Sequence, residues 1–247
     1  MIYVTGDMHG SFSRLKRKSF AEQIHMTKSD YVIICGDFGI WDNSPQEREW
    51  MKWLDAKPFT TLFVDGNHEN FDRLSKYPVS DWNGGKVQYI NDSVIHLMRG
   101  QVYELCGKLL FTMGGASSHD ISAGILDPDA PDFKTKKKQL DAHFAMYRIN
   151  HLSWWKEELP SQEEYEISRN NLSRYGWKVD YIITHCCPSS ILNTFSNGIY
   201  QPDHLTEFLD EVKDRCSFDH WFFGHYHDNR IVQEKYVMLY KKILQIV

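Results

Sequence analysis

The chain contains 247 residues with a formal net charge of -5, and 42% of its residues are hydrophobic, including 8 Trp and 14 Phe. This composition supplies ample apolar surface for a core. It excludes a disordered tail, a collagen-like repeat and a small disulfide-stapled domain. The negative charge argues against a general polyanion binder, which would carry a broad basic surface.

Features of export and membrane insertion are not expected from this sequence. No apolar run approaches the roughly 18 residues that a membrane-spanning helix needs. The chain starts with a strand-like run at residues 2–4 rather than with a leader-like segment. The five cysteines, at positions 35, 106, 186, 187 and 216, form no paired framework. We therefore expect a reduced, cytoplasmic protein that does not enter membranes.

Short apolar runs typical of strands recur along the chain. The most continuous of them lie at residues 2–4, 31–35, 61–64, 181–184 and 221–223. Because their apolar residues are continuous rather than alternating, we expect both faces of each strand to be buried, as in a sheet covered by helices. Further short runs at residues 87–90, 94–98, 101–105, 109–113 and within 230–247 indicate hairpins.

Helices are predicted between these strands. Ser44 and Ser161 each precede a Glu three residues later, which is the pattern of a helix N-cap, and Pro45 suits a first helical position. Residues 202–215 carry apolar side chains at positions 205, 208, 209 and 212, the spacing of one helix face. A pair of mixed sheets with flanking helices is the simplest assembly of these elements.

The five continuous strands share a second property, because each ends in polar residues that can bind a metal ion. These residues are Asp7, His9, Asp37, Asn67, His68, His185, His225 and His227. Glycines at positions 6, 10, 36, 66 and 224 lie beside them and let the backbone approach a ligand closely. Since sites in α/β sheets form beyond the carboxyl ends of the strands, we expect these clusters to converge on one edge as a shared metal site.

In their order along the chain, these clusters resemble the sequence blocks of the calcineurin-like metallophosphoesterases. The blocks are Asp7-Met8-His9, Gly36-Asp37, Gly66-Asn67-His68-Glu69, His185 and Gly224-His225-Tyr226-His227. The resemblance implies an α/β fold, a four-layer α/β/β/α sandwich with mixed sheets, as a single domain over residues 1–247. It also implies a dinuclear metal centre.

The resemblance further implies a role for each site residue. The first ion would be held by Asp7, His9, Asp37 and His227. The second would be held by Asp37, Asn67, His185 and His225, so that Asp37 bridges both ions. His68 would be the general acid for the leaving oxygen, or a donor that stabilises the charge developing on it.

The chemistry of these residue types agrees with that implication. Imidazole suits transition metals better than Mg²⁺ or Ca²⁺, so we expect two divalent transition-metal ions, manganese first, with iron, zinc, cobalt or nickel as alternatives. Two ions about 3.5–4 Å apart can generate hydroxide near neutral pH and clamp phosphoryl oxygens during in-line displacement. No covalent enzyme intermediate is then required.

Two departures from the family pattern bear on mechanism and substrate. Many relatives carry Gly-Asp-x-x-Asp, whose final Asp orients the catalytic histidine, whereas this chain has Ile40 there. Asp42 and Asp65 are the candidates for the missing carboxylate. The Ser/Thr protein phosphatase branch usually carries two phosphate-gripping Arg residues, where this chain has Asp65 and the Ile40-Trp41 pair. The chain therefore resembles the bacterial and phage-type branch more than the protein phosphatases.

The segment at residues 114–155 is predicted to form a lid or wall over the site. It begins with a Gly-Gly-Ala turn that resembles one in bacterial relatives, and His119 and Arg148 are its candidates for phosphate or leaving-group contacts. Cys186 and Cys187 could reach a metal, although small buried side chains at a crowded turn are the simpler interpretation. Likewise, Trp41 and the Trp154-Trp155 pair could stack on a nucleobase or pack in the core.

These features together predict a metal-dependent phosphohydrolase that uses a hydroxide bridging two metals, with small phosphodiester or nucleotide substrates favoured. One alternative is a phosphomonoesterase, including a phosphoprotein phosphatase. The alternative from another class is a non-catalytic, metal-binding interaction scaffold. Nucleic acid is not a favoured partner, because the basic run at residues 134–138 is typical of a solvated helix face. The sequence predicts no membrane partner and leaves the oligomeric state open.

Overall fold

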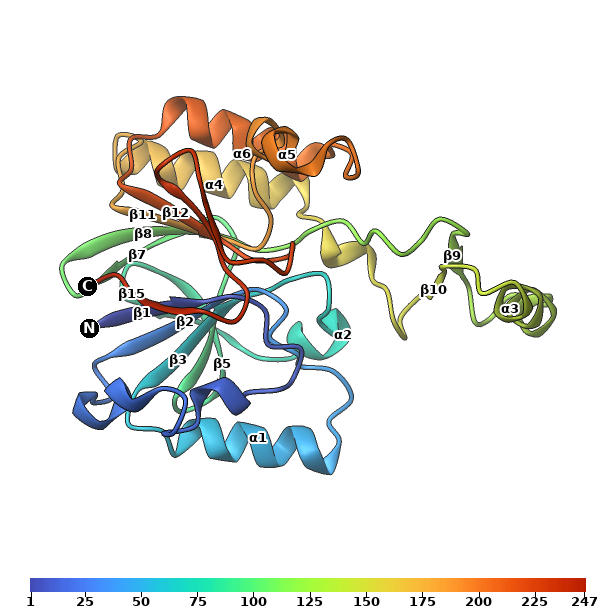
Figure 1. Ribbon diagram of the computed structural model, residues 1–247, viewed down its shortest axis with the longest axis horizontal. Helices are drawn as coiled ribbons and strands as arrows, with labels where there is room; N and C mark the ends of the chain where they lie inside the picture. Colours follow the sequence, from blue (N-terminus) through green and yellow to red (C-terminus); the bar gives the residue numbers. More distant parts are fainter.

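The computed structural model describes all 247 residues and contains two large mixed sheets that face each other (Figure 1). In spatial order the first sheet is β15 (Ile243–Gln245), β1 (Ile2–Thr5), β2 (Tyr31–Cys35), β3 (Thr60–Val64), β6 (Val94–Leu97), β5 (Gly85–Asn91) and β4 (Val79–Trp82). The second sheet is β13 (Arg230–Val232), β14 (Tyr236–Met238), β12 (His220–Phe223), β11 (Tyr181–Thr184), β8 (Lys108–Met113) and β7 (Gln101–Leu105). Both sheets are mixed, with parallel strands at their centres.

Helices cover the outer face of each sheet. On the first sheet lies α1 (Pro45–Asp55), whereas α4 (Gln162–Arg174), α5 (Ser189–Ser196) and α6 (His204–Arg215) lie on the second (Figure 1). The short helix α2 (Phe71–Leu74) follows β3. The predicted four-layer α/β/β/α sandwich is confirmed. No helix is both long and apolar enough to cross a membrane.

The layers explain why the strands are continuously apolar. In β2, Val32 and Ile34 lie in the core under α1, while Ile33 and Cys35 lie in the core between the sheets. Successive side chains of a strand point to opposite faces, so a strand between two cores needs apolar residues at every position. A third core joins the second sheet to the helices that cover it.

The predicted helix starts are also confirmed. The Ser44 side chain accepts a hydrogen bond from the backbone of Glu47 at the start of α1. In α4, Ser161 and Glu164 form a reciprocal capping box. One expectation needs refinement, because the polar clusters do not share the edge of a single sheet. They follow β1, β2 and β3 of the first sheet and β11 and β12 of the second, and they meet where the two sheets face each other.

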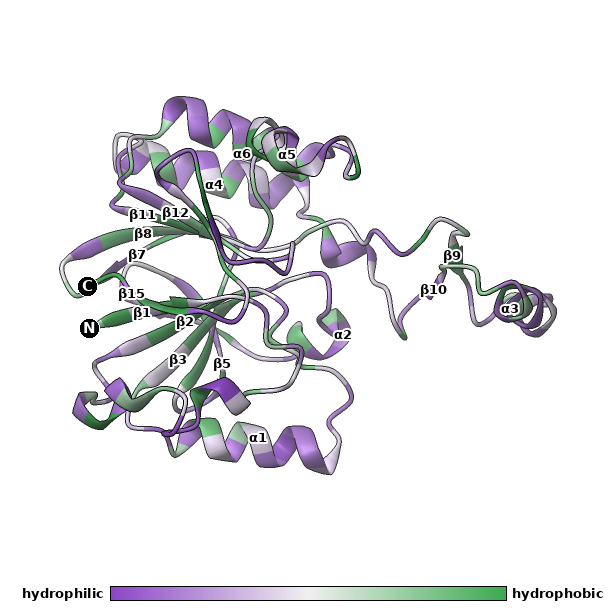
Figure 2. Ribbon diagram, viewed as in Figure 1, coloured by the Kyte–Doolittle hydropathy of each residue, from purple (hydrophilic) through white to green (hydrophobic).

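Residues 121–147 form an arm that projects away from the sandwich (Figure 1). The arm contains β9 (Ile125–Leu126), which pairs with β10 (Arg148–Ile149), and α3 (Phe133–Ala142). No residue of α3 is buried, and most of its residues are hydrophilic (Figure 2). The segment predicted as a lid or wall is therefore divided, with its ends at the sandwich and its middle far from it. Closure over the site stays a prediction.

Candidate metal centre and active site

The backbone that carries the candidate ligands adopts an unusual conformation. His9, Asp37, His225 and His227 have φ angles of 45°, 47°, 68° and 53°. Left-handed backbone is uncommon for residues other than glycine, and such strained residues cluster at functional sites. Four of the thirteen non-glycine residues with positive φ therefore lie where the first and second sheets present their polar side chains to each other.

Two glycines make room for these side chains, as the sequence indicates. A Cβ atom on Gly36, whose φ is +90°, would lie 2.0 Å from Nδ1 of His185. A Cβ atom on Gly224 would lie 2.2 Å from Oδ1 of Asp7. Any larger residue at either position would therefore collide with a site residue that comes from the other sheet.

Four of the predicted ligands form one compact group. Ligand atoms of Asp7, His9, Asp37 and His227 all lie within 4.8 Å of one another. Nε2 of His227 lies 3.0 Å from Oδ2 of Asp7 and 3.0 Å from Nε2 of His9. Nε2 of His9 lies 3.7 Å from Oδ2 of Asp37. This is the set predicted for the first ion.

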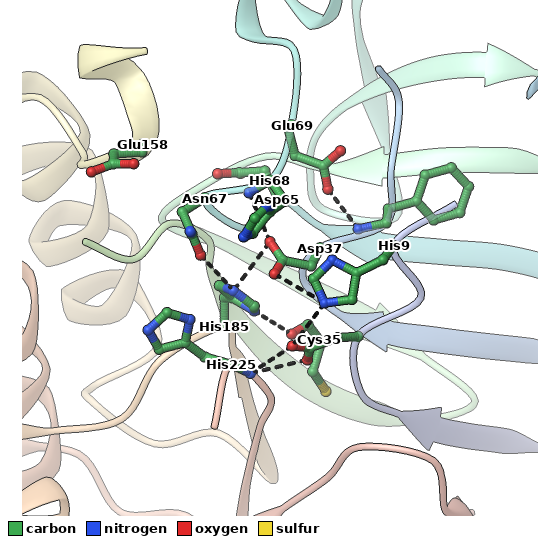
Figure 3. Close-up of polar contacts among 12 residues, drawn as sticks. His9, Cys35, Asp37, Asp65, Asn67, His68, Glu69, Glu158, His185 and His225 are labelled. Carbon is green, nitrogen blue, oxygen red and sulfur yellow. Dashed lines mark hydrogen bonds and ion pairs between the residues drawn. The ribbon is translucent and has the colours of Figure 1, made fainter. Parts of the chain in front are cut away.

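A second group forms around the other oxygen of Asp37. Nε2 of His185 lies 3.3 Å from Oδ1 of Asp37 and 3.3 Å from Oδ1 of Asn67 (Figure 3). Nδ1 of His185 donates to the carbonyl of Cys35 at 2.8 Å, which fixes the orientation of the ring. The two oxygens of Asp37 thus face different groups, as a bridging carboxylate requires. His225, the remaining predicted ligand, packs against His185 with 4.9 Å between ring centroids.

The electrostatics of the site also fit a cation. Burial alone would raise the pKa of Asp37, but the imidazoles of His185, His68 and His9 hold it well below its usual range. Burial works against a charged His185, yet the facing carboxylate of Asp37 raises the pKa of that ring to about 10. A buried carboxylate needs a positive partner. A divalent ion would supply that charge and would require the neutral form of His185.

Hydrogen bonds outside the two groups hold Asn67 in its orientation. Nδ2 of Asn67 donates to Oγ of Ser118 at 3.2 Å, and that hydroxyl donates to Oε2 of Glu158 at 2.6 Å. With Nδ2 engaged, Oδ1 of Asn67 is the atom that faces His185. These contacts could not be predicted from the sequence, because Ser118 and Glu158 are far from Asn67 along the chain and belong to no motif.

His68 lies between Asp37 and Arg148. Its backbone N–H donates to Oδ1 of Asp37 at 2.8 Å, and its Nε2 lies 3.0 Å from Nη2 of Arg148. A guanidinium can only donate, so Nε2 of His68 accepts this bond and a neutral ring carries its proton on Nδ1. Burial and the charge of Arg148 lower the pKa of His68, although Asp37 opposes them. Arg148 is itself held by Asp120, at 2.7 Å from its Nε.

Neither of the acids suggested as a substitute for the family carboxylate contacts His68. Asp65 is buried and lies 2.6 Å from Arg99, which supplies the positive charge that its burial requires, and 3.1 Å from His96. Asp42 is exposed, and its Oδ1 accepts the backbone N–H of Ser44 at 2.9 Å.

The aromatic, cysteine and lysine residues singled out in the sequence pack in the fold or form ion pairs on its surface. Trp155 is buried, donates to Asp72 at 2.7 Å, and packs edge-on against Trp41. Cys186 and Cys187 are buried in the core of the second sheet, and burial raises the pKa of both thiols. On α3, Lys136 and Lys137 form exposed ion pairs with Asp132 and Asp141.

A cavity of about 320 Å³ adjoins His9 and His68. Its other walls include Trp41, Asp42, Ser44, Gln46, Glu47 and Trp50. Aromatic rings and hydrogen-bond acceptors thus surround it, and no Lys or Arg lines it. The cavity can take an organic group beside the metal positions but offers no countercharge to a second phosphate.

A four-layer sandwich that gathers carboxylates and imidazoles between its two sheets is the architecture of a phosphoester hydrolase. The calcineurin-like phosphoesterase family matches residues 1–229, and the chain belongs to this family. Members of the family generally depend on divalent metal ions, and the compact group of Asp7, His9, Asp37 and His227 offers a possible ligand cluster.

Two curated relatives match part of the chain. The lariat debranching enzyme of Arabidopsis thaliana is 30% identical over 105 residues, which are 36% of this chain and 25% of that protein. Lariat debranching enzyme A of Xenopus laevis is 26% identical over 115 residues, which are 40% of this chain and 22% of that protein. The matched segments thus account for a quarter or less of the length of these relatives.

Proposed function

We propose that this phosphoester hydrolase is a dinuclear metal-dependent phosphodiesterase for small diesters or nucleotides. The observation that carries the proposal is that the two oxygens of Asp37 face separate ligand groups. Asp7, His9, Asp37 and His227 would hold one divalent ion. The other would be held by Asp37, Asn67, His185 and His225. When bound, two such ions, manganese first among the candidates, supply Lewis acidity and a nucleophile derived from water.

The chain contributes two groups beside the metal positions. Arg148 brings a buried positive charge toward the site, where it attracts a phosphoryl oxygen. His68 is positioned through its backbone bond to Asp37 and supports the leaving oxygen as proton donor or hydrogen-bond donor. Because Nε2 of His68 accepts a hydrogen bond from Arg148, that nitrogen can donate to the leaving oxygen only after the guanidinium turns toward the phosphoryl group and Nε2 takes up a proton from solvent.

The cavity beside His68 favours a diester over a monoester. A diester carries a second organic group, and a cavity of about 320 Å³ with aromatic walls provides space for it. The names of the two relatives, lariat debranching enzymes, also favour a diester and introduce nucleic acid as a second candidate substrate. We place small diesters first, since Asp42 and Glu47 line the cavity and would repel a continuing chain of phosphates.

The decisive experiment compares hydrolysis of bis-p-nitrophenyl phosphate and p-nitrophenyl phosphate by chelator-stripped protein with and without Mn²⁺. We expect Mn²⁺-dependent activity that is higher on the diester and is abolished by Asp37→Ala. His68→Asn should lose about 10²–10⁴ in rate while retaining its metal, because the metal positions stay intact. Metal content measured by mass spectrometry on the same samples distinguishes loss of bound metal from loss of a catalytic group.

Each rival function predicts a different result. Faster turnover of the monoester would favour the phosphomonoesterase, including a phosphoprotein phosphatase. If fully metallated protein hydrolysed neither ester, the result would favour the non-catalytic scaffold. Binding of DNA or RNA that weakens steeply with added salt would favour a nucleic-acid substrate.

A further inference from the structure

We propose that His119 is a positioning residue for the second metal position, where it sets the ring of His225. The inference rests on the proposed function and names a side chain outside the predicted ligand set. Nε2 of His119 lies 2.7 Å from Nε2 of His225, although the two residues are 106 positions apart. His225 follows β12, and His119 lies in the loop between β8 and the arm.

The contact determines which nitrogen of His225 can serve as a ligand. Because Nε2 is engaged by His119, only Nδ1 is left for a metal ion. Figure 3 shows a ring nitrogen of His225 on the side of His185 and Asn67. A ligand nitrogen must offer its lone pair, so the proton of a neutral His225 belongs on Nε2, which then donates to His119. His119 thereby selects both the tautomer and the orientation of the ring.

Ser118, which precedes His119 in the chain, contacts another ligand proposed for the second ion. Its Oγ accepts a hydrogen bond from Nδ2 of Asn67 at 3.2 Å, while His119 contacts His225. Two successive residues of one loop thus fix two of the ligands proposed for the second ion. Among the first group, no ligand has a hydrogen bond to this loop, because the partners of His9 and His227 come from within that group. The loop therefore supports one metal position selectively.

His119 is itself held in place. Its ring packs against Tyr200 with 4.4 Å between centroids, and it is tilted by 45° to both Tyr200 and His225. In this inference His119 acts through His225, whereas the sequence suggested a contact to phosphate or to the leaving group, because Nε2 of His119 already has a partner. Metal ligands in proteins commonly depend on such partners, whose loss weakens metal binding about 10–100-fold.

The test is calorimetric titration of chelator-stripped wild type, His119→Ala and His119→Gln with Mn²⁺ and, separately, Co²⁺. We expect two binding events in the wild type, of which one weakens about 10–100-fold in His119→Ala while the other is unchanged. His119→Gln should recover part of the loss, because its side-chain oxygen can still accept the Nε2–H of His225. The exposed His204→Ala is the matched control and should titrate like the wild type.

Several outcomes would overturn the inference. If His119→Ala bound the metal ion in both events as tightly as the wild type, His119 would have no positioning role. If that variant also had a raised KM for the ester, His119 would be a substrate contact instead. Equal weakening of both events, or a lowered thermal midpoint in His119→Ala, would indicate a general structural effect. The proposed function is tested independently of this inference. If the wild type bound two ions but cleaved neither ester, the proposed function would be contradicted, while the metal titrations would still test the role of His119.

Discussion

Glu69 is fully buried and accepts three backbone hydrogen bonds from the turn that follows Asp37. Its Oε1 accepts the N–H of Phe38 at 2.6 Å, and its Oε2 accepts those of Gly39 at 3.0 Å and Ile40 at 3.1 Å. The turn therefore depends on a carboxylate that arrives from the loop after β3. At position 40 the backbone N–H binds Glu69 while the Ile side chain is buried in the core under α1, a place that suits Ile better than Asp.

Replacing Glu69 with Gln should destabilise the protein. An amide has one acceptor oxygen, so at least one of the three buried N–H groups loses its partner and faces an NH₂ group instead. We expect Glu69→Gln to lower the free energy of unfolding in urea by about 1–3 kcal/mol, the usual cost of an unsatisfied buried donor. Glu49→Gln, at an exposed position of α1, is the control. Equal stability of the two variants would show that the turn holds without this carboxylate.

At the scale of elements, the arm at residues 121–147 stands apart from the rest of the fold. Its helix α3 has ten residues and buries none of them, and β9 and β10 are two residues each. Helices shorter than about 12–15 residues are marginal in water without packing. The arm therefore adds little to global stability and belongs to the parts of a protein that open most easily.

Removal of the arm tests its relation to the site. Replacing residues 128–146 with a short flexible Gly-Ser linker should leave the thermal midpoint unchanged, since α3 contributes nothing to the cores. Turnover of bis-p-nitrophenyl phosphate should also persist, because His119 and Arg148 lie outside the deletion and keep their anchors. A large loss of kcat/KM with an unchanged midpoint would instead show that the arm closes over the site, as predicted for a lid.

At the scale of the whole molecule, the sequence predicted what is local and missed what depends on the approach of distant segments. The strands β2 and β11 were predicted to the residue, because unbroken apolar runs have few other interpretations. The candidate ligands could be proposed from the sequence because they follow strand ends, and the structure brings Asp7, His9, Asp37 and His227 together. The partner of His68 was not predicted, since Arg148 follows the arm and lies 80 residues away from His68 along the chain. The basic run at residues 134–138, interpreted as a solvated helix face, does lie on α3, but the sequence did not predict the bounds of this helix because it has no apolar stripe.

Asp65 and Arg99 tie separate parts of the sandwich together. Asp65 follows β3 in the first sheet, and Arg99 precedes β7 in the second. Nη2 of Arg99 lies 2.6 Å from Oδ2 of Asp65 and donates to the carbonyl of Glu157, near α4, at 2.7 Å. Burial alone would raise the pKa of Asp65, but Arg99 and His96 hold it well below its usual range. Folding therefore favours the ionised form of this carboxyl.

The pH dependence of stability should report this pair. Asp65 is ionised to a lower pH in the folded than in the unfolded chain, so its contribution is complete above the unfolded pKa of about 3.9 and is lost as the pH falls further. We expect Asp65→Asn to lower the free energy of unfolding by about 3–5 kcal/mol at neutral pH, since the buried Arg99 loses its close counterion and keeps only the more exposed Glu164, 3.5 Å from its Nη1. In urea titrations at successive pH values, the gap to the wild type should narrow by about 1.4 kcal/mol per pH unit below pH 4. The exposed Asp219→Asn should show no such gap. A gap that stays constant in acid would mean that Asp65 acts through packing rather than through its charge.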